Sequence, residues 1–308
     1  MALPAELADR LTLPLIAAPM TGVSGPELVT AACRNGVIGS FPTHNAPTVD
    51  ALDTWLRRIT GELAPHPDAA PIAPNLVVHR TNPRLAGDLD RLIAHGVQLV
   101  ITSVGSPEAV IGPLHRAGCR VFADVATLRH AERALDAGAD GLVLLTAGAG
   151  GQTGSANPFA FVRAIREHFS GPLVLAGGIS DGRALFAARA LGADLAYMGT
   201  GFIATTESLA PQDYREAVVT ATLDDIRQTA QLAGLPANLL AAWLESQAPQ
   251  SVSAGDFQAE RLLDGRTVWS AGHSVSGVHA VRSVAELIER VRAQYRDAHR
   301  HLFDMTCH

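Results

Sequence analysis

Short apolar segments alternate with helix-like segments eight times within the first 222 residues of this 308-residue chain. Strands that alternate with helices pair in parallel through right-handed crossovers, and eight such units in this length fit a (β/α)8 barrel better than an open doubly wound sheet. We therefore predict an α/β protein with a TIM barrel over residues 1–222. The predicted strands are Leu13–Ala18, Val37–Phe41, Ile72–Val78, Gln98–Thr102, Arg120–Val125, Leu142–Leu145, Leu173–Ala176 and Leu195–Met198.

The predicted helices lie between these strands, and two of the junctions are near-repeats. AGADGLVLL at Ala137–Leu145 and LGADLAYMG at Leu191–Gly199 both place Gly-Ala-Asp at a helix end just before a strand. Glycine there is the expected C-cap of a helix. The predicted helices are Pro26–Asn35, Val49–Glu62, Pro83–His95, Pro107–Ala117, Leu128–Ala137, Asn157–Phe169, Asp181–Leu191 and one that begins near Gln212.

Beyond Thr220 the alternation loosens into helical pieces. We predict helices at Leu223–Leu232, Pro236–Glu245 and Val284–Ala298, with a loop at Ala248–Phe257. Residues 223–308 are too few for a clear second domain. We expect a helical extension that packs on the barrel over its mouth or mediates self-association into a homo-oligomer.

Composition narrows the classes of protein that this chain can represent. The mean hydropathy is +0.16, yet no apolar run approaches the ~20 residues of a membrane span and the first residues do not resemble a signal peptide. We therefore expect a cytoplasmic protein. The net charge of −6 and the lack of a Lys/Arg run argue against a nucleic-acid partner. Cys33, Cys119 and Cys307 show no CxxC spacing, so we expect ordinary thiols, with no disulfide framework and no metal site.

Three successive strand ends run directly into glycine-rich loops. These junctions are Gly141–Gly154, Leu173–Ser180 and Leu195–Gly201. Backbone N–H groups in such loops can bind phosphate, and the seventh and eighth loops of a (β/α)8 barrel are where phosphate is commonly held. The alternative is that the glycines serve only tight turns and close helix packing. The loops lack a full GxGxxG, so they do not predict a dinucleotide site.

Polar residues also follow the predicted strands, where a barrel would bring them to one face. His44 follows the second strand, and His79 follows the third close to Asn75. We predict that His79, before His44, contacts substrate, with a structural or surface histidine as the alternative for each. Asp124 also lies at a strand end, where a buried carboxylate satisfied by backbone N–H groups is the alternative to a functional role.

Five motifs resemble those of the nitronate monooxygenase (2-nitropropane dioxygenase) family of FMN-dependent barrels. They are LIAAPMTGVSGPELVTAACRNGVIGSF, GAGGQTG, LAGGISDGRAL, GADLAYMGTGFIAT and WSAGH, and they span nearly the whole chain. The resemblance implies a barrel that holds FMN non-covalently. The cofactor-binding residues that we predict on this basis are Ala18, Pro19, Met20, Asn75, Asp124, Gly150, Gly151, Gly177, Gly178, Met198, Gly199 and Thr200.

The chain departs from the family at one catalytic position. Many members carry AGGH in the glycine loop, where the histidine takes a proton from the carbon next to the nitro group, and the matching residue here is Gln152. A carboxamide cannot accept that proton at neutral pH, but it can donate a hydrogen bond to a ligand oxygen. We predict Gln152 and His79 as catalytic residues. His44, His79, Gln152 and His273, the last in the WSAGH segment that approaches the flavin in the family, are the predicted substrate-binding residues.

The function predicted from the resemblance is an FMN-dependent oxidoreductase that oxidises alkyl nitronates with O2. The loss of the AGGH histidine keeps a second function open, an NAD(P)H-dependent reductase of quinones or enoyl thioesters on the same scaffold. A flavin-binding protein without turnover is a third alternative. Each of these has a small molecule as its partner.

Overall fold

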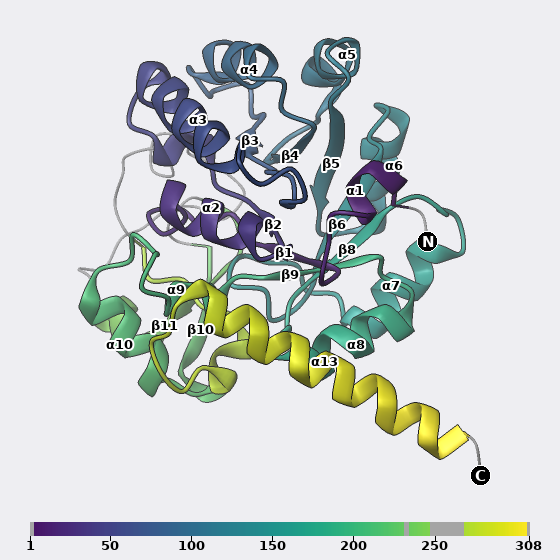
Figure 1. Cartoon of the computed structure of the whole chain (residues 1–308), viewed down its shortest axis with the longest axis vertical. Helices are drawn as coiled ribbons and strands as arrows, with labels where there is room; N and C mark the ends of the chain where they lie inside the picture. The colour runs from purple at the N-terminus through teal and green to yellow at the C-terminus, as the bar shows by residue number, and fades with distance from the viewer. Residues whose placement is uncertain (1–2, 231–233, 247–267, 307–308) are drawn as a thin grey trace.

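Eight parallel strands form one curled sheet at the centre of the molecule (Figure 1). Apart from the second strand, each barrel strand pairs with the next barrel strand along the chain, and the last pairs back with the first. Parallel bridges from Gly39 to Ile72 and from Pro42 to Asn75 link the two outermost strands of the sheet, so the predicted (β/α)8 barrel is confirmed. The strands are β1 (Leu15–Ala17), β2 (Ile38–Gly39), β3 (Asn75–Val77), β4 (Leu99–Ser103), β5 (Arg120–Val125), β6 (Gly141–Leu145), β8 (Leu173–Ala176) and β9 (Leu195–Met198). This computed structural model describes residues 3–230, 234–246 and 268–306.

The helices between the strands begin and end close to their predicted bounds. Several begin at a residue whose side chain accepts a hydrogen bond from the first turn, as Thr48, Thr127 and Asp181 do. Two short helices, α1 and α9, were not predicted. The helices of the barrel are α1 (Ala5–Ala8), α2 (Pro26–Arg34), α3 (Val49–Leu63), α4 (Leu85–Ala94), α5 (Glu108–Arg116), α6 (Leu128–Asp136), α7 (Pro158–Arg166), α8 (Gly182–Leu191), α9 (Thr200–Ile203) and α10 (Gln212–Thr220).

The barrel strands are apolar on both faces, so they lie between two hydrophobic layers, one inside the barrel and one between the strands and the helices. Side chains such as Ile16, Phe122 and Val174 fill the inside of the barrel. Their neighbours in sequence, such as Leu15 and Val121, pack outward against the helices. Polar groups can therefore gather only at the strand ends, where the inner layer stops.

The segment after α10 differs from the expected helical extension. It contains the short helix η2 (Leu223–Asp225), strand β10 (Ile226–Thr229), strand β11 (Ala237–Leu240) and helix α11 (Ala241–Ser246). The helix predicted at Leu223–Leu232 is helical only over η2, and most of its remaining described residues form β10 instead. The one predicted at Pro236–Glu245 is helical only in its second half. A short apolar run does not distinguish strand from helix, and here antiparallel pairing decides for strand. The predicted loop at Ala248–Phe257 lies outside the described residues.

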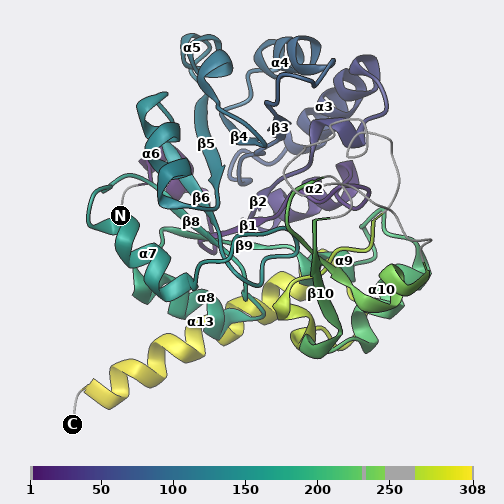
Figure 2. The same cartoon turned by 180° about the vertical axis from the view of Figure 1, so that it is seen from behind.

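A third strand completes this small sheet, and it comes from the barrel. β7 (Gly151–Gln152) lies within the first glycine loop and pairs with β11, with Gln152 opposite Ala237 and Gly151 opposite Asn238. The three-stranded sheet β10-β11-β7 thus connects the glycine loop with residues almost 90 positions further along the chain. Figure 2 shows β10 beside the barrel, close to α9 and α10.

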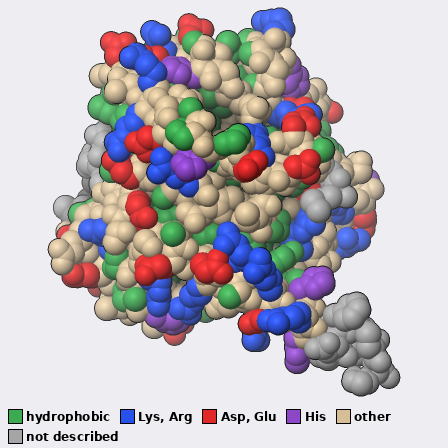
Figure 3. Space-filling model, viewed as in Figure 1, with side chains coloured by type: hydrophobic (Ala, Val, Ile, Leu, Met, Phe, Trp, Pro, Cys, Tyr) green, Lys and Arg blue, Asp and Glu red, His purple; other side chains and the backbone are tan. Residues whose placement is uncertain are grey.

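The last helix, α13 (Val284–Thr306), contains the predicted Val284–Ala298 and runs away from the barrel at its C-terminal end (Figures 1 and 2). It packs on α8 where Gly182 allows close approach, because a Cβ at Gly182 would lie 2.2 Å from the carbonyl oxygen of Val291. None of the described helices has the length and apolar character that crossing a membrane requires. Acidic and arginine side chains are interspersed over the face seen in Figure 3.

The two described cysteines are buried, as expected for ordinary thiols. Burial raises the pKa of both Cys33 and Cys119 to about 12, so neither is a reactive thiolate at neutral pH. The third, Cys307, lies outside the described residues.

Candidate active site

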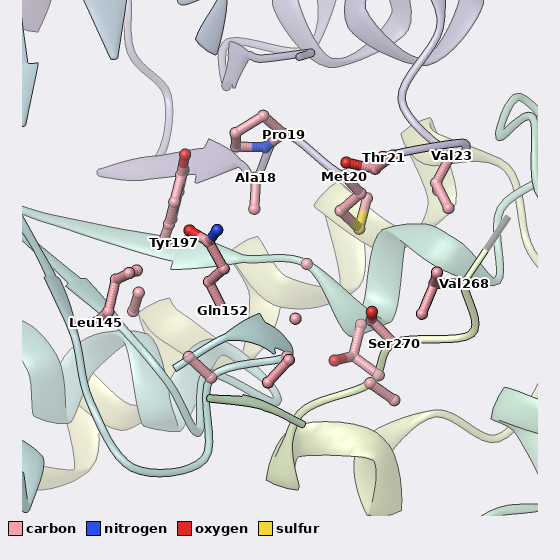
Figure 4. Close-up of a pocket in the computed structure, with 18 of the residues that line it drawn as sticks. Ala18, Pro19, Met20, Thr21, Val23, Leu145, Gln152, Tyr197, Val268 and Ser270 are labelled. Carbon is pink, nitrogen blue, oxygen red and sulfur yellow. The ribbon is translucent and has the colours of Figure 1, made fainter. Parts of the chain in front are cut away.

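A cavity of about 320 Å³ lies at the carboxyl ends of the barrel strands. Its floor comes from strand-end residues, and one wall comes from β11, α11 and the segment that includes Val268 and Ser270. Figure 4 shows Ala18, Met20 and Gln152 pointing into this shared space. The site therefore sits where parallel α/β barrels place their ligands.

The structure brings most of the predicted cofactor-binding residues to this cavity. Met198 is the exception, since its side chain is buried in the outer layer between the strands and the helices. Successive side chains of a strand point to opposite faces, so its neighbour Tyr197 lines the cavity instead. The predicted residues that do line the cavity are Ala18, Pro19, Met20, Asn75, Asp124, Gly150, Gly151, Gly177, Gly178, Gly199 and Thr200.

The two glycine loops after β8 and β9 present unused backbone donors. Within the described residues, the N–H groups of Gly178, Ile179, Gly199 and Thr200 donate no hydrogen bond. A Cβ placed on Gly178 meets nothing within 4 Å, and its φ of +75° is one that glycine adopts readily. Four backbone donors beside open space form a site for an anion such as phosphate.

Asn75 and Ser103 form a buried polar pair at the ends of β3 and β4. The Ser103 hydroxyl donates to Asn75 Oδ1 at 3.0 Å, which fixes the orientation of the amide. The Asn75 amide nitrogen donates to no group of the described residues. Because Asn75 lines the cavity, this nitrogen is available to a ligand acceptor.

Three buried polar atoms around the cavity have no hydrogen-bond partner in the described part of the chain. They are Asp124 Oδ1, the Tyr197 hydroxyl and His44 Nδ1, although His44 Nε2 lies 3.0 Å from the Thr21 hydroxyl. Burial raises the pKa of Asp124 to about 8. Burial followed by the nearby Asp124 raises the pKa of Tyr197, against a smaller opposite effect of the Ser40 hydroxyl. Burial, then the Arg84 cation, lowers the pKa of His44 to about 4. The alternative that backbone N–H groups satisfy Asp124 is wrong for Oδ1.

Gln152 reaches the cavity because β7 pairs with β11. Its amide points toward the side of the cavity where Ala18 and Tyr197 lie (Figure 4). Asn238 of β11 also holds the glycine loop, since its amide nitrogen donates to the Ala149 carbonyl at 2.8 Å. The pairing of β7 with β11 therefore holds an uncharged hydrogen-bond donor at the cavity.

The structure does not bring the other two predicted histidines into the cavity. His79 Nδ1 lies 2.8 Å from the hydroxyl of Thr81, two residues further on, and His79 is absent from the described lining. His273 is exposed, and its ring packs behind the glycine loop, where a Cβ on Gly148 would lie 2.8 Å from His273 Nδ1. Of the predicted substrate-binding residues, only His44 and Gln152 line the cavity.

Several lining residues were missed by the sequence analysis. Val104, directly after β4, has a φ of +55°, which is unusual for a β-branched residue. Tyr214 stacks on Trp269 with ring centroids 5.2 Å apart, and no local motif predicts this contact. Tyr197 could have been predicted, because side chains alternate between the two faces of β9 and every second one points into the barrel. The apolar wall depends on the extension and consists of Leu235, Leu239, Trp243, Leu244 and Val268 with Val23 and Ile203 of the barrel.

Comparisons with known proteins agree with this arrangement. A family model described as nitronate monooxygenase matches residues 6–293. A nitronate monooxygenase of Paraburkholderia phytofirmans is 30% identical, with 74% of this chain and 73% of that protein covered. A Mycobacterium tuberculosis protein named (3aS,4S,5R,7aS)-5-hydroxy-7a-methyl-1-oxo-octahydro-1H-indene-4-carboxyl-CoA dehydrogenase is 27% identical, with 80% and 68% covered. The solved structure of FabK from Thermotoga maritima superposes with a TM-score of 0.82 at 24% identity, covering 98% of each chain, which shows the same fold.

Proposed function

Because this chain belongs to the nitronate monooxygenase family and is thus an oxidoreductase, we propose that it binds FMN in the strand-end cavity and oxidises alkyl nitronates with O2. The observation that carries the proposal is the continuity of the cavity with the four unused backbone donors of the glycine loops. The cavity thus offers a phosphate site and space for a planar ring in one enclosure. FMN has one phosphate, and the loops offer one such site.

The lining residues fit FMN in chemistry as well as in position. Gly178, Ile179, Gly199 and Thr200 would hold the phosphate through their N–H groups, and the Asn75 amide would donate to a polar edge of the ring. Gly150 has no room for a side chain, since a Cβ there would lie 2.7 Å from the Gly272 nitrogen. When bound, FMN supplies the capacity to take two electrons from a substrate and pass them to O2.

The protein's own part is to bind and orient an anion that is already deprotonated. The Gln152 amide donates a hydrogen bond to a nitronate oxygen but removes no proton. The apolar wall, with Leu239, Trp243 and Val268, contacts the alkyl group and excludes water. A preformed nitronate needs no base, so this arrangement suits it better than a neutral nitroalkane.

Two measurements test the proposal. Chromatography of the released cofactor against standards is expected to show FMN; recovery of FAD, or of no flavin after reconstitution, contradicts the site assignment. Anaerobic mixing with propyl-2-nitronate is expected to bleach the bound flavin, while NADH and NADPH leave it oxidised.

A second function is favoured by the absence of a base at position 152 together with the apolar wall. A reductase that passes hydride to a quinone or enoyl thioester needs no proton abstraction at Gln152, and the wall offers space for a bulky apolar group. The relative named as a carboxyl-CoA dehydrogenase acts, by its name, on a thioester. Rapid bleaching by NADH or NADPH but not by the nitronate would favour this reductase over the monooxygenase.

A further inference from the structure

The floor of the cavity contains polar atoms that the protein itself leaves unsatisfied. Of the five buried side-chain polar atoms without a partner in the described residues, three belong to lining residues: Asp124, Tyr197 and His44. Folded proteins leave few such atoms unpaired, because each costs about 1–3 kcal/mol. Their concentration around one cavity indicates that a bound group completes their hydrogen bonds.

No cation among the described lining residues offsets a charge on Asp124. The described lining contains neither lysine nor arginine, and Arg120, at the opposite end of β5, pairs with Glu6. The neighbouring strands bring uncharged residues beside Asp124: Ser103 on β4 and Val143 on β6, with Leu145 two residues further along β6. Within the part of the chain that the structure describes, an ionised Asp124 would therefore be a buried carboxylate without a counterion, which is strongly unfavourable.

The titratable groups around Asp124 fall into two sets. Those that share the cavity with it are Tyr197 of β9, His44 of the η1 turn (Thr43–Asn45) and Tyr214 of α10. Helices α5 and α6 also pack on β5, but on the outside of the barrel, opposite the cavity that Asp124 lines. Their titratable residues are Glu108, His115, Arg116, Arg129, His130, Glu132, Arg133 and Asp136.

We propose that Asp124 stands in the cavity as a neutral carboxylic acid and, with the Tyr197 phenol, donates hydrogen bonds to a conjugated oxygen acceptor of the bound group. Under the proposed function, on which this identification rests, the acceptor is either a ring carbonyl of the flavin or an oxygen of the nitronate. The neutral acid leaves the floor uncharged, so an anion enters without repulsion. Asp124 and Tyr197 thus give the cavity two further hydrogen-bond donors for the bound oxygen, in addition to the amide of Gln152.

The protonation state can be measured without catalysis. In cofactor-free protein with 13Cγ-labelled aspartate, assigned by comparison with Asp124→Asn, the Asp124 signal is expected to titrate near pH 8 and not near the ordinary value of about 3.9. A midpoint near 4 overturns the proposal. This measurement depends neither on FMN nor on nitronate turnover, so its failure is distinct from failure of the proposed function.

Adding each occupant separately identifies the acceptor. A hydrogen bond that the neutral acid donates stabilises the protonated form and raises its pKa. FMN is therefore expected to raise the Asp124 titration midpoint if the ring carbonyl is the acceptor. Inorganic nitrate, a planar oxyanion of constant charge, added to the FMN-loaded protein is expected to raise it if the nitronate oxygen is the acceptor. A midpoint that neither occupant moves overturns the donor role.

Binding of nitrate gives an independent readout. In the wild type its Kd is expected to rise about tenfold per pH unit above pH 8, because binding then requires proton uptake. Asp124→Asn keeps a donor and should remove this dependence, while the exposed Asp90→Asn should follow the wild type. Tyr197→Phe should raise Kd at every pH without removing the dependence. If Asp124→Asn retains the wild-type dependence, the titrating group is another residue and the proposal is wrong; if this variant does not fold, the wild-type titration decides.

Discussion

Replacing Gly178 by aspartate is expected to abolish FMN retention while the barrel still folds. A Cβ at this position has open space, so the side chain fits, and the positive φ of +75° costs about 1–2 kcal/mol. The new carboxylate, however, stands among backbone donors that face the phosphate. At ~5 Å from a phosphate dianion it adds about 1.7 kcal/mol of repulsion even at the dielectric constant of water, or about 20-fold in Kd, and about four times that energy at an effective constant of 20.

Gly118→Asp is the matched control for this variant. Gly118 has the same φ of +75° and equally open space, but it lies in the turn between α5 and β5, outside the described cavity lining. Both variants should lose similar thermal stability, and only Gly178→Asp should lose flavin. The measurements are the thermal midpoint, the ratio of flavin to protein absorbance after purification, and the Kd of FMN by fluorescence titration. Equal FMN affinity in the two folded variants would refute the phosphate assignment.

Three further outcomes are expected. Gln152→His should raise kcat/KM for a neutral nitroalkane relative to its preformed nitronate, although by less than the ~10²–10⁴-fold of an oriented base; equal wild-type efficiency on both forms would show that another residue is the base. Gly182→Ala should lower the free energy of unfolding by about 1–3 kcal/mol in denaturant titrations, since its Cβ meets the α13 backbone, whereas Gly61→Ala, with nothing within 4 Å, should raise it by about 0.5–1 kcal/mol. Burial lowers the pKa of His44 to about 4, so between pH 6.5 and 4 the unfolded chain carries a proton on this histidine that the folded chain does not. The free energy of unfolding should therefore decrease as the pH falls from 6.5 to 4, and an equal decrease in His44→Gln would contradict this.

The barrel could be predicted from the chain because its signals are local. Each strand is a short apolar run, each is followed by an amphipathic helix, and glycine marks the turns, as at Gly192, whose φ is +112° at the end of α8. Eight repetitions leave one closed parallel arrangement, and the rule that ligands bind at strand ends then predicts where Asn75, Asp124 and Gly178 gather. These predictions require only the order of residues along the chain.

The remaining features depend on contacts between distant segments. The run Ala237–Leu240 is a strand because it pairs with β7, almost 90 residues earlier, and that pairing is also what presents Gln152 to the cavity. The backbone of His79 follows the predicted strand end, but its ring contacts Thr81 and lies outside the described cavity lining. The direction of this side chain, which the sequence does not specify, is why the predicted contact with substrate is not seen. The isolation of Asp124 depends likewise on which groups other strands bring beside it. Sequence period and glycine placement specify where the backbone runs, whereas the partner of each buried polar atom is determined only when segments far apart in sequence meet.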